Sequence, residues 1–352
     1  MTASADVSNP PLISVIMAVY NCERFVADAI QSILSQSEAN FEFIIIDDGS
    51  TDGTAVILSE WAGRDERIRL LSGAHGGPSH ARNLGLAASC GDYVAHMDAD
   101  DIALPGRFRQ QLAMMNETGV EVCGCCARSF GGAARLWLYP EHHEAICKEL
   151  LIANALMHAT LMLRGDLARA HPYDETLWNL EDYELLTRLA ISARLGNVQQ
   201  VLYLWRSHAG QTHIMLKSTA RETLRRTRRV YMLARYPQME DYERLLQLAD
   251  QSAFERLEDL EQAGECLLRL AEDPDGFLRR KMAKRWRSAC RQSVGLGLGV
   301  YTLYRRLLPR FGPGKRTGDA DLWLAALLML PPGSGLGQVY QGLKRLAHRR
   351  GK

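Results

Sequence analysis

The feature that most constrains the fold of this chain is a series of short, mostly apolar runs in its first hundred residues. Residues 12–19 read Leu-Ile-Ser-Val-Ile-Met-Ala-Val, and residues 41–46 and 93–97 form two further runs. Strands that are covered on both faces have this composition, whereas a strand with one wet face alternates apolar and polar residues. The runs therefore predict strands that lie inside a sheet with helices on both sides.

Segments with helical periodicity lie between these runs. In residues 24–35 the apolar side chains recur every three or four positions, and residues 79–88 form a second such segment, preceded by one more predicted strand at 68–71. Alternating strands and helices are typical of a parallel sheet whose strands are joined by crossover helices. We therefore expect an α/β fold with a Rossmann-like, mostly parallel sheet.

Polar residues follow three of the predicted strands at the point where each strand ends. Tyr20 follows the first strand, Asp47 and Asp48 follow the second, and residues 98–101 (Asp-Ala-Asp-Asp) follow the fourth. Ligands of open parallel sheets bind at the carboxyl ends of the strands. The sequence therefore predicts a binding site at this edge of the sheet.

The pattern changes twice after residue 104. A mixed region comes first, with strands expected at 120–129, 135–139, 160–164 and 198–205 and helices at 141–152 and 181–194. After residue 212 only helical patterns remain. We therefore divide the chain into an α/β domain, 1–211, and a helical region, 212–352.

The charge of the chain is unevenly distributed. Its 42 Lys and Arg nearly balance 41 Asp and Glu, but residues 279–352 hold 17 Lys and Arg against two Asp. Such a basic tail predicts an anionic partner. Residues 1–10 lack the apolar run of a signal peptide, and the eight cysteines show no metal-ligand spacing. We expect reduced, buried thiols and a cytoplasmic location.

Each polar cluster has a structural interpretation as well as a functional one. Asp98 and Asp100 suit a Mg²⁺ or Mn²⁺ ion, but such a turn can also only cap a helix. Asp48 can accept a hydrogen bond from a nucleobase N–H, or it can only stabilise its own turn. Arg82, in the loop and helix start at 75–83, can hold an anionic ligand or lie on the surface.

Taken together, the motifs resemble the family 2 glycosyltransferases, which are inverting enzymes with the GT-A fold. The resemblance covers about residues 12–213. It is carried by the motifs at 15–21 (Val-Ile-Met-Ala-Val-Tyr-Asn), 47–52 (Asp-Asp-Gly-Ser-Thr-Asp), 81–83 (Ala-Arg-Asn), 97–101 (Met-Asp-Ala-Asp-Asp), 180–185 (Leu-Glu-Asp-Tyr-Glu-Leu) and 203–208 (Tyr-Leu-Trp-Arg-Ser-His).

The resemblance implies a donor site for a nucleotide sugar, with UDP- or dTDP-sugars as the expected donors. Val19, Tyr20 and Asp48 would bind the nucleobase, with Arg82 nearby, and Asp98 would contact the ribose. The acceptor would be a glycan or a lipid-linked sugar in polysaccharide or glycoconjugate synthesis.

The resemblance also implies the catalytic groups. Asp100 would bind Mg²⁺ or Mn²⁺, with His208 as a further ligand, and Asp182 would be the catalytic base. One base and one Lewis acid suffice for direct displacement at an anomeric carbon, so a second catalytic carboxylate is unnecessary. Glu181, the neighbour of Asp182, is expected to interact with the helix dipole instead.

The acceptor side is less defined by the sequence. His158 lies where the family lines the acceptor site, although Ala159 stands in place of the usual proline. Trp178 could stack on a sugar face or pack in the core. Together with Glu181, these residues form the expected acceptor side.

The helical tail allows two interpretations. The apolar run at 322–330 is much shorter than the ~20 residues that span a bilayer. We expect the tail to lie on an anionic membrane surface, at the inner face of the cell membrane. The alternative is a helical bundle, which could form a homo-oligomer. Because apolar runs interrupt the basic residues, nucleic-acid binding is not expected.

Two rival functions follow from the same features. A nucleotidylyltransferase would need a Gly-rich, basic loop after the first strand, where this chain has Tyr20-Asn21-Cys22-Glu23. A non-catalytic nucleotide-sugar-binding or assembly protein is the alternative from another class. The presence of both Asp100 and Asp182 favours the enzyme.

Overall fold

The computed structural model describes residues 13–132, 134–177, 179–208, 218–272 and 276–312, together with Leu322 and Ala326. The chain forms two compact units. The first comprises Met1–Cys147 and Asn154–Ala220, and the second comprises Lys148–Ala153 and Arg221–Lys352. The expected boundary at residue 211 falls outside the described residues.

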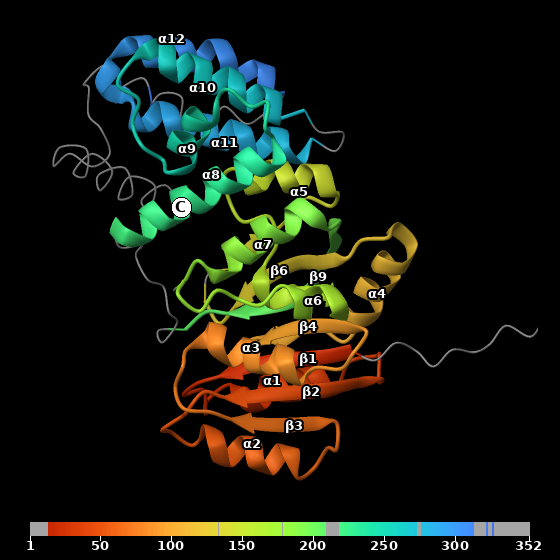
Figure 1. The fold of residues 1–352 in the computed structure, drawn as a ribbon. Coiled ribbons are helices and arrows are strands. Elements are labelled where there is room, and N and C mark those ends of the chain that lie inside the picture. The colour runs from red at the N-terminus through yellow and green to blue at the C-terminus, as the bar shows by residue number, and fades with distance from the viewer. Residues whose placement is uncertain are drawn as a thin grey trace, which may run out of the picture. The chain divides into compact units, whose positions relative to one another are not determined.

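The first unit begins with the predicted parallel strands. These are β1 (Ile13–Val19), β2 (Phe41–Asp47), β3 (Ile68–Ser72) and β4 (Tyr93–Asp98), joined by α1 (Val26–Leu34), α2 (Thr54–Ala62) and α3 (Pro78–Ala88). They pair in parallel in the order β3-β2-β1-β4 (Figure 1). The carboxyl ends of β1, β2 and β4 therefore lie along one edge, as the sequence predicts.

The second half of the unit makes the sheet mixed. It contains β5 (Ile102–Ala103), α4 (Arg107–Thr118), β6 (Val122–Phe130), β7 (Leu136–Trp137), α5 (His143–Leu150), the 3₁₀ turn η1 (His158–Thr160), β8 (Met162–Arg164), α6 (Gly165–Ala170), α7 (Glu181–Ser192) and β9 (Leu195–Arg206). The sheet continues from β4 as β8-β6-β9-β5, and β7 pairs with β6. β8 is antiparallel to both β4 and β6, while β6 and β9 are parallel. The expectation of a mostly parallel sheet with flanking helices is confirmed.

Three helices were not predicted from the sequence, namely α2, α4 and α6. The apolar residues of α2 are consecutive and one of them, Val56, is exposed, so helical periodicity is weak there. In α4 the polar Arg107 and Gln111 share the buried face with Phe108 and Leu112. Buried polar residues hide the apolar stripe on which periodicity arguments depend.

These two polar side chains bind α4 to the sheet. Arg107 donates from Nη2 to the carbonyl of His96 in β4 at 2.8 Å. Gln111 donates from Nε2 to the carbonyls of Cys123 in β6 and Thr160 in η1, both at 2.8 Å. Burial lowers the pKa of Arg107. The pair thus holds the centre of the sheet together behind the polar edge.

Helices cover both faces of the parallel strands. Val15 and Met17 of β1 belong to the same apolar cluster as Ile30 of α1 and Phe108 of α4. α3 packs on the opposite face, where Gly85 allows close approach: a Cβ atom at Gly85 would lie 2.6 Å from Ile16 Cγ2. The sheet is thus buried on both sides, as its apolar runs require.

All the regular secondary structure among the described residues of the second unit is helical, as expected. It comprises α8 (Ser218–Arg235), α9 (Tyr242–Ala249), α10 (Leu257–Leu270), α11 (Phe277–Gln292), the 3₁₀ turn η2 (Val294–Leu296), α12 (Leu298–Leu307) and the 3₁₀ turn η3 (Leu308–Phe311). Trp286 of α11 is fully buried against Gly264 of α10, which leaves no room for a larger residue.

No helix among the described residues combines the length and apolarity needed to cross a membrane. Apart from Leu322 and Ala326, the apolar run at 322–330 lies outside the described residues. All eight cysteines are free thiols, and six of them are buried.

The close contact of α3 with the sheet makes a stability prediction. Gly85→Ala places a methyl group 2.6 Å from Ile16 Cγ2 and 2.8 Å from Ile46 Cδ1. Overpacking of this kind costs about 1–3 kcal/mol, of which the better helix propensity of Ala offsets up to about 1 kcal/mol. We therefore expect a net loss of about 1–2 kcal/mol in the free energy of unfolding, measured by urea titration.

Gly63→Ala is the matched control for this substitution. Gly63 is exposed after α2 with φ −72°, and its nearest neighbours would lie 3.5 Å from a Cβ atom. This variant should be neutral or slightly stabilising, because Ala reduces the entropy of the unfolded chain. Equal stability of the Gly85 and Gly63 variants would contradict the proposed packing of α3.

Candidate active site

The ends of β1 and β2 are joined into one structural unit. The amide of Asp48 donates to the carbonyl of Val19 at 2.8 Å. Beyond β1, Asn21 adopts φ +48° and accepts the amide of Thr51 at 2.7 Å, while its own amide donates to Ser50 Oγ at 3.0 Å. The turn after β2 is therefore held against the residues that follow β1.

Tyr20 and Asp48 share a partner that the sequence reasoning did not identify. Tyr20 is 46% exposed, and its ring stacks on that of His75 at 4.2 Å between centroids. His75 Nδ1 lies 2.9 Å from Asp48 Oδ2. The amides of Gly76 and Gly77 also donate to the Asp48 carboxylate, at 2.8 and 2.9 Å. The loop at 75–77 is thus anchored on Asp48.

Arg82 of α3 connects three parts of the site. Its guanidinium donates to Glu181 Oε1 at 3.2 Å, lies 3.6 Å from Asp98 Oδ1, and sits over the ring of Tyr173 at 5.7 Å. Burial opposes the charge of Arg82, but Asp98 and its other anionic neighbours outweigh burial and raise its pKa. Arg82 therefore stays charged between the end of β4 and the start of α7.

Negative charge is concentrated around Asp98. Burial raises the pKa of Asp98 to about 6; Arg82 opposes this rise, while Asp100, Glu181 and Asp182 add to it. Arg82 contacts both Asp98 and Glu181, which places the start of α7 beside the end of β4. The structure therefore brings the acidic groups of two distant motifs to one place.

The end of β9 is fastened to the acidic turn after β4. His208 Nε2 lies 3.0 Å from Asp100 Oδ2. Arg206 donates from Nε to the carbonyl of Asp100 and from its amide to Asp101 Oδ1, both at 2.7 Å. Burial raises the pKa of Asp101 to about 9. Asp101 thus supports the turn, while Asp100 and His208 face each other.

The Asp100–His208 pair fits a divalent cation whose coordination is completed by a substrate. Mg²⁺ and Mn²⁺ take carboxylate oxygens, and ions such as Mg²⁺ usually keep positions for water and phosphate oxygens. Within the ranges that the structure describes, no group of three or more His, Cys, Asp or Glu side chains is arranged to hold a metal ion. A cation at Asp100 and His208 would therefore keep most of its coordination positions for other ligands.

Asp182 lies at the second position of α7, where the helix dipole favours a negative charge. Its Oδ1 accepts the amide of Tyr183 at 2.6 Å, and its Oδ2 accepts Asn154 Nδ2 at 2.9 Å. Burial and then Glu181 raise its pKa, while these two donors lower it. A carboxylate whose pKa lies above its ordinary value is better suited to accept a proton.

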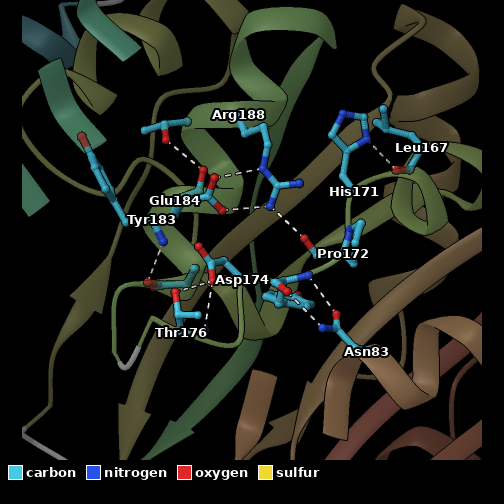
Figure 2. A network of polar contacts seen from close by, with 12 residues as sticks. Asn83, Leu167, His171, Pro172, Asp174, Thr176, Tyr183, Glu184 and Arg188 are labelled. Atoms are coloured by element: carbon cyan, nitrogen blue, oxygen red, sulfur yellow. Dashed lines mark hydrogen bonds and ion pairs between the residues drawn. The ribbon is translucent and has the colours of Figure 1, made fainter. Parts of the chain in front are cut away.

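The segment before α7 is held by a polar network (Figure 2). Asn83 of α3 exchanges two hydrogen bonds with the backbone of Tyr173, at 2.8 and 3.0 Å. Arg188 donates to the carbonyl of Pro172 at 2.8 Å and pairs with Glu184. These contacts fix Tyr173, whose ring lies under Arg82.

The three residues expected on the acceptor side have different surroundings. His158 Nε2 lies 2.6 Å from the hydroxyl of Tyr173, which also lies 3.0 Å from His96 Nε2. Burial lowers the pKa of His96 to about 3 and that of His158 well below its ordinary value, so both are neutral. Glu181 holds Arg82, and Trp178 lies outside the described residues.

Four residues of the site were missed by the sequence reasoning. Asn154 and Tyr173 lie outside the motifs, although Asn154 is the one polar residue in the run 150–157. His75 and Arg206 lie inside segments that were noted, but their partners, Tyr20 and the acidic turn, are distant in sequence. Of the four missed residues, only His75 and Arg206 could have been proposed from the motifs.

Comparisons with known proteins agree with this architecture. Residues 14–168 match the family model of glycosyl transferase family 2. Over 237 residues the chain is 30% identical to an uncharacterized glycosyltransferase of Haemophilus influenzae, which covers 63% of this chain and 73% of the relative. It is also 31% identical over 208 residues to the O-antigen biosynthesis glycosyltransferase WbnJ of Escherichia coli, covering 57% of this chain and 82% of WbnJ.

The fold is similar to that of a solved structure, residues 1–349 of TarS from S. aureus in complex with UDP-GlcNAc. The TM-score is 0.56 with 17% sequence identity, and the match covers 92% of each chain. This similarity confirms the expected GT-A fold. From the extent of the match to the Haemophilus relative, together with the family model, it follows that this chain belongs to glycosyltransferase family 2.

Proposed function

We propose that the protein transfers a sugar from a UDP- or dTDP-activated donor to an acceptor hydroxyl, with inversion at the anomeric carbon. The observation that carries this proposal is that Arg82 joins Asp98, at the carboxyl end of β4, to Glu181, the neighbour of the candidate base Asp182. The name of WbnJ, an O-antigen biosynthesis enzyme, and the UDP-GlcNAc bound by TarS support a role in cell-surface glycan synthesis.

The donor would bind along the strand ends. The nucleobase would stack on the exposed ring of Tyr20 and donate its N–H to Asp48, between the backbone at Val19 and the loop that contains His75. His75 already makes a stacking contact with Tyr20 and an N–H contact with Asp48, so it would yield this position to the base. Asp98 would accept a ribose hydroxyl next to Arg82.

The chemical step would be a single displacement. Asp182 takes the proton of the acceptor hydroxyl, the acceptor oxygen forms a bond to the anomeric carbon, and the bond from that carbon to the diphosphate oxygen breaks on the opposite face. The nucleoside diphosphate leaves, and the product carries the inverted configuration. One base is enough for this step. We assign His158 to supporting Tyr173 and Glu181 to holding Arg82.

A divalent cation held by Asp100 and His208 would offset the charge that develops on the departing diphosphate. The residues of the chain then have separate tasks: Arg82 faces the acidic cluster, Arg206 holds the turn that bears Asp100, and Asp182 accepts the proton. This separation of tasks supports metal dependence.

The second unit would place the enzyme at an anionic membrane surface, where a lipid-linked acceptor is found. In α11, Arg280, Lys284 and Arg287 follow a spacing of four and three residues, and the helix contains no acidic residue. Within the described part of the chain none of these three pairs with a carboxylate, whereas Arg306 of α12 pairs with Glu261. An unneutralised basic stripe supports attachment at the cytoplasmic face of the membrane.

The base assignment predicts opposite effects of two substitutions. Asp182→Asn should lower turnover about 10²- to 10⁴-fold because it removes the base, while donor affinity stays within a few-fold. Asp48→Ala should weaken donor binding more than it slows turnover. A panel of UDP- and dTDP-sugars, read by release of nucleoside diphosphate, measures turnover, and calorimetry measures donor affinity.

Two results would contradict this assignment. Normal turnover by Asp182→Asn would move the base role to Glu181. Donor binding without turnover by the wild-type protein, across the panel and with glycan and lipid-linked acceptors, would favour the non-catalytic binding protein.

The metal site makes a second prediction. Asp100→Ala should abolish the dependence of turnover on Mn²⁺ or Mg²⁺ and reduce turnover to the level of the wild-type protein in excess chelator. Asp166→Ala, an exposed carboxylate paired with Arg164, is the matched control and should respond to metal like the wild type. Full wild-type turnover in chelator would rule out metal dependence.

The membrane proposal predicts that vesicle binding depends more on where the basic residues lie than on the net charge of the protein. The triple variant Arg280→Gln, Lys284→Gln, Arg287→Gln should bind vesicles of phosphatidylglycerol and phosphatidylcholine roughly 100-fold more weakly, since each basic residue near an anionic surface contributes about 1 kcal/mol. Co-sedimentation at low and high salt measures this, because added salt screens the attraction.

The control removes three cations that already have carboxylate partners. Its changes are Arg225→Gln, Arg306→Gln and Arg310→Gln, whose partners are Glu243, Glu261 and Glu265. The change in net charge is identical, so equal weakening in both variants would reject a specific role for α11. A concentration-dependent dimer without vesicle binding would favour the helical bundle.

A further inference from the structure

Asn154 is a polar residue in an otherwise apolar part of the chain, residues 150–157. It is partly buried, and its side chain contacts the proposed catalytic base. Its Nδ2 donates to Asp182 Oδ2 at 2.9 Å, across 28 residues of sequence. This is the one side-chain hydrogen bond of Asn154 among the described residues.

The other end of the same side chain is unsatisfied. Asn154 Oδ1 is buried and accepts no hydrogen bond from any described residue. A buried carbonyl oxygen without a partner costs folding free energy, because it has lost its hydrogen bonds to water. The oxygen of Asn154 therefore does not stabilise the fold, and the role of this residue has to lie in its amide group.

A second asparagine shows what a structural role involves. Asn197 of β9 is fully buried, and its Nδ2 donates to the backbone carbonyls of Pro140 and Ala155 at 2.8 and 3.1 Å. It therefore ties three segments of backbone together. The Oδ1 atoms of both asparagines lack a donor among the described residues, so the difference lies in their amides: Asn154 donates to no backbone carbonyl in the described residues, and its amide is directed at one carboxylate.

We propose that Asn154 is a positioning residue that fixes the carboxylate of Asp182 and maintains it as the proton acceptor. This inference rests on the proposed function of Asp182. Tyr183 and Asn154 each occupy one oxygen of the carboxylate. Each carboxylate oxygen has two lone-pair directions, so one direction on each oxygen remains open for the acceptor hydroxyl.

The charges around Asp182 explain why such a donor is needed. Glu181 of the same helix, and Asp98 at the end of β4, favour the protonated form, whereas Arg82 of α3 favours the ionised form. Tyr173, the remaining titratable neighbour, is neutral because burial raises its pKa well above the ordinary value. A hydrogen bond to the charged form favours ionisation, so the amide of Asn154 adds to Arg82 against burial and Glu181.

The test compares Asn154→Leu with Asn197→Leu in the full-length protein. Turnover is the release of UDP from whichever of UDP-GlcNAc, UDP-glucose and UDP-galactose the wild type uses fastest, and binding is calorimetry with UDP and Mn²⁺. Asn154→Leu should lower kcat about 10- to 100-fold, leave the Kd for UDP within two-fold, and move the acid limb of the pH profile of kcat/KM to higher pH. Asn197→Leu should lower the Tm and leave the acid limb in place.

A double variant separates positioning from a general structural effect. Once Asp182→Asn has removed the base, adding Asn154→Leu should slow turnover no further, because both changes act on one group. Multiplicative losses would overturn the inference. If Asn154→Leu does not fold, the isosteric Asn154→Asp replaces it, and a second carboxylate at this distance should move the acid limb further to higher pH.

A measurement without turnover distinguishes failure of this inference from failure of the proposed function. The carboxyl ¹³C signal of Asp182, assigned by its absence in Asp182→Asn, should titrate at higher pH in Asn154→Leu than in the wild type. An unchanged titration would overturn the role of Asn154 and leave the base assignment to the earlier test. A shifted titration with unchanged kcat would instead remove Asp182 from the role of base and overturn the positioning role with it.

Discussion

The contact of Arg82 with Asp98 and Glu181 is the interaction on which the site depends. The turn after β4 and the start of α7 both carry carboxylates, and these would repel each other without an intervening cation. Arg82 comes from a third element, α3, and its guanidinium lies over the ring of Tyr173. One guanidinium therefore sets the relative positions of the parts that would bind the donor and activate the acceptor.

The carboxylates of the site carry more negative charge than Arg82 alone neutralises, and this affects the chemistry that the site can support. The pKa of Asp98 lies near 6 and that of Asp101 near 9, in both cases chiefly because of burial. Asp101 is therefore protonated near neutral pH, whereas an ionised carboxylate in such a place is costly unless a cation compensates it. The requirement is met in part by Arg82 and Arg206, and the Asp100–His208 pair leaves room for a further cation. The same feature that destabilises the isolated site would favour the binding of a cation there.

The mixed half of the sheet completes the site, because it places the remaining site residues next to the strand ends of the parallel half. β9 pairs with β5 at the acidic turn and with β6, so its end brings Arg206 and His208 to Asp100. The hydrogen bonds of Asn83 and Arg188 hold the segment before α7, at Tyr173 and Pro172, in place beside the parallel half. A parallel sheet alone would provide a nucleotide site, whereas these additions supply the candidate metal ligand and base.

The sequence by itself determined the parallel strands, the edge of the sheet at which the polar motifs gather, the helical second unit and the resemblance to the family. Each of these follows from local composition, such as the apolar run of β1 or the acidic residues after β4. Asp98, Asp100, Asp182 and His208 could be proposed as site residues in advance, because each stands in a short, recognisable motif.

Only the tertiary structure decided which of these side chains meet. The stacking of His75 on Tyr20, the contact of Asn154 with Asp182 and the burial of Arg107 beneath the sheet join residues that no local pattern connects. The helices α2 and α4 were missed for the same reason: exposed apolar or buried polar residues acquire their meaning from what packs against them. Periodicity reports the burial of a segment on average, while hydrogen bonds and charges depend on pairs of atoms that only the folded chain brings within reach.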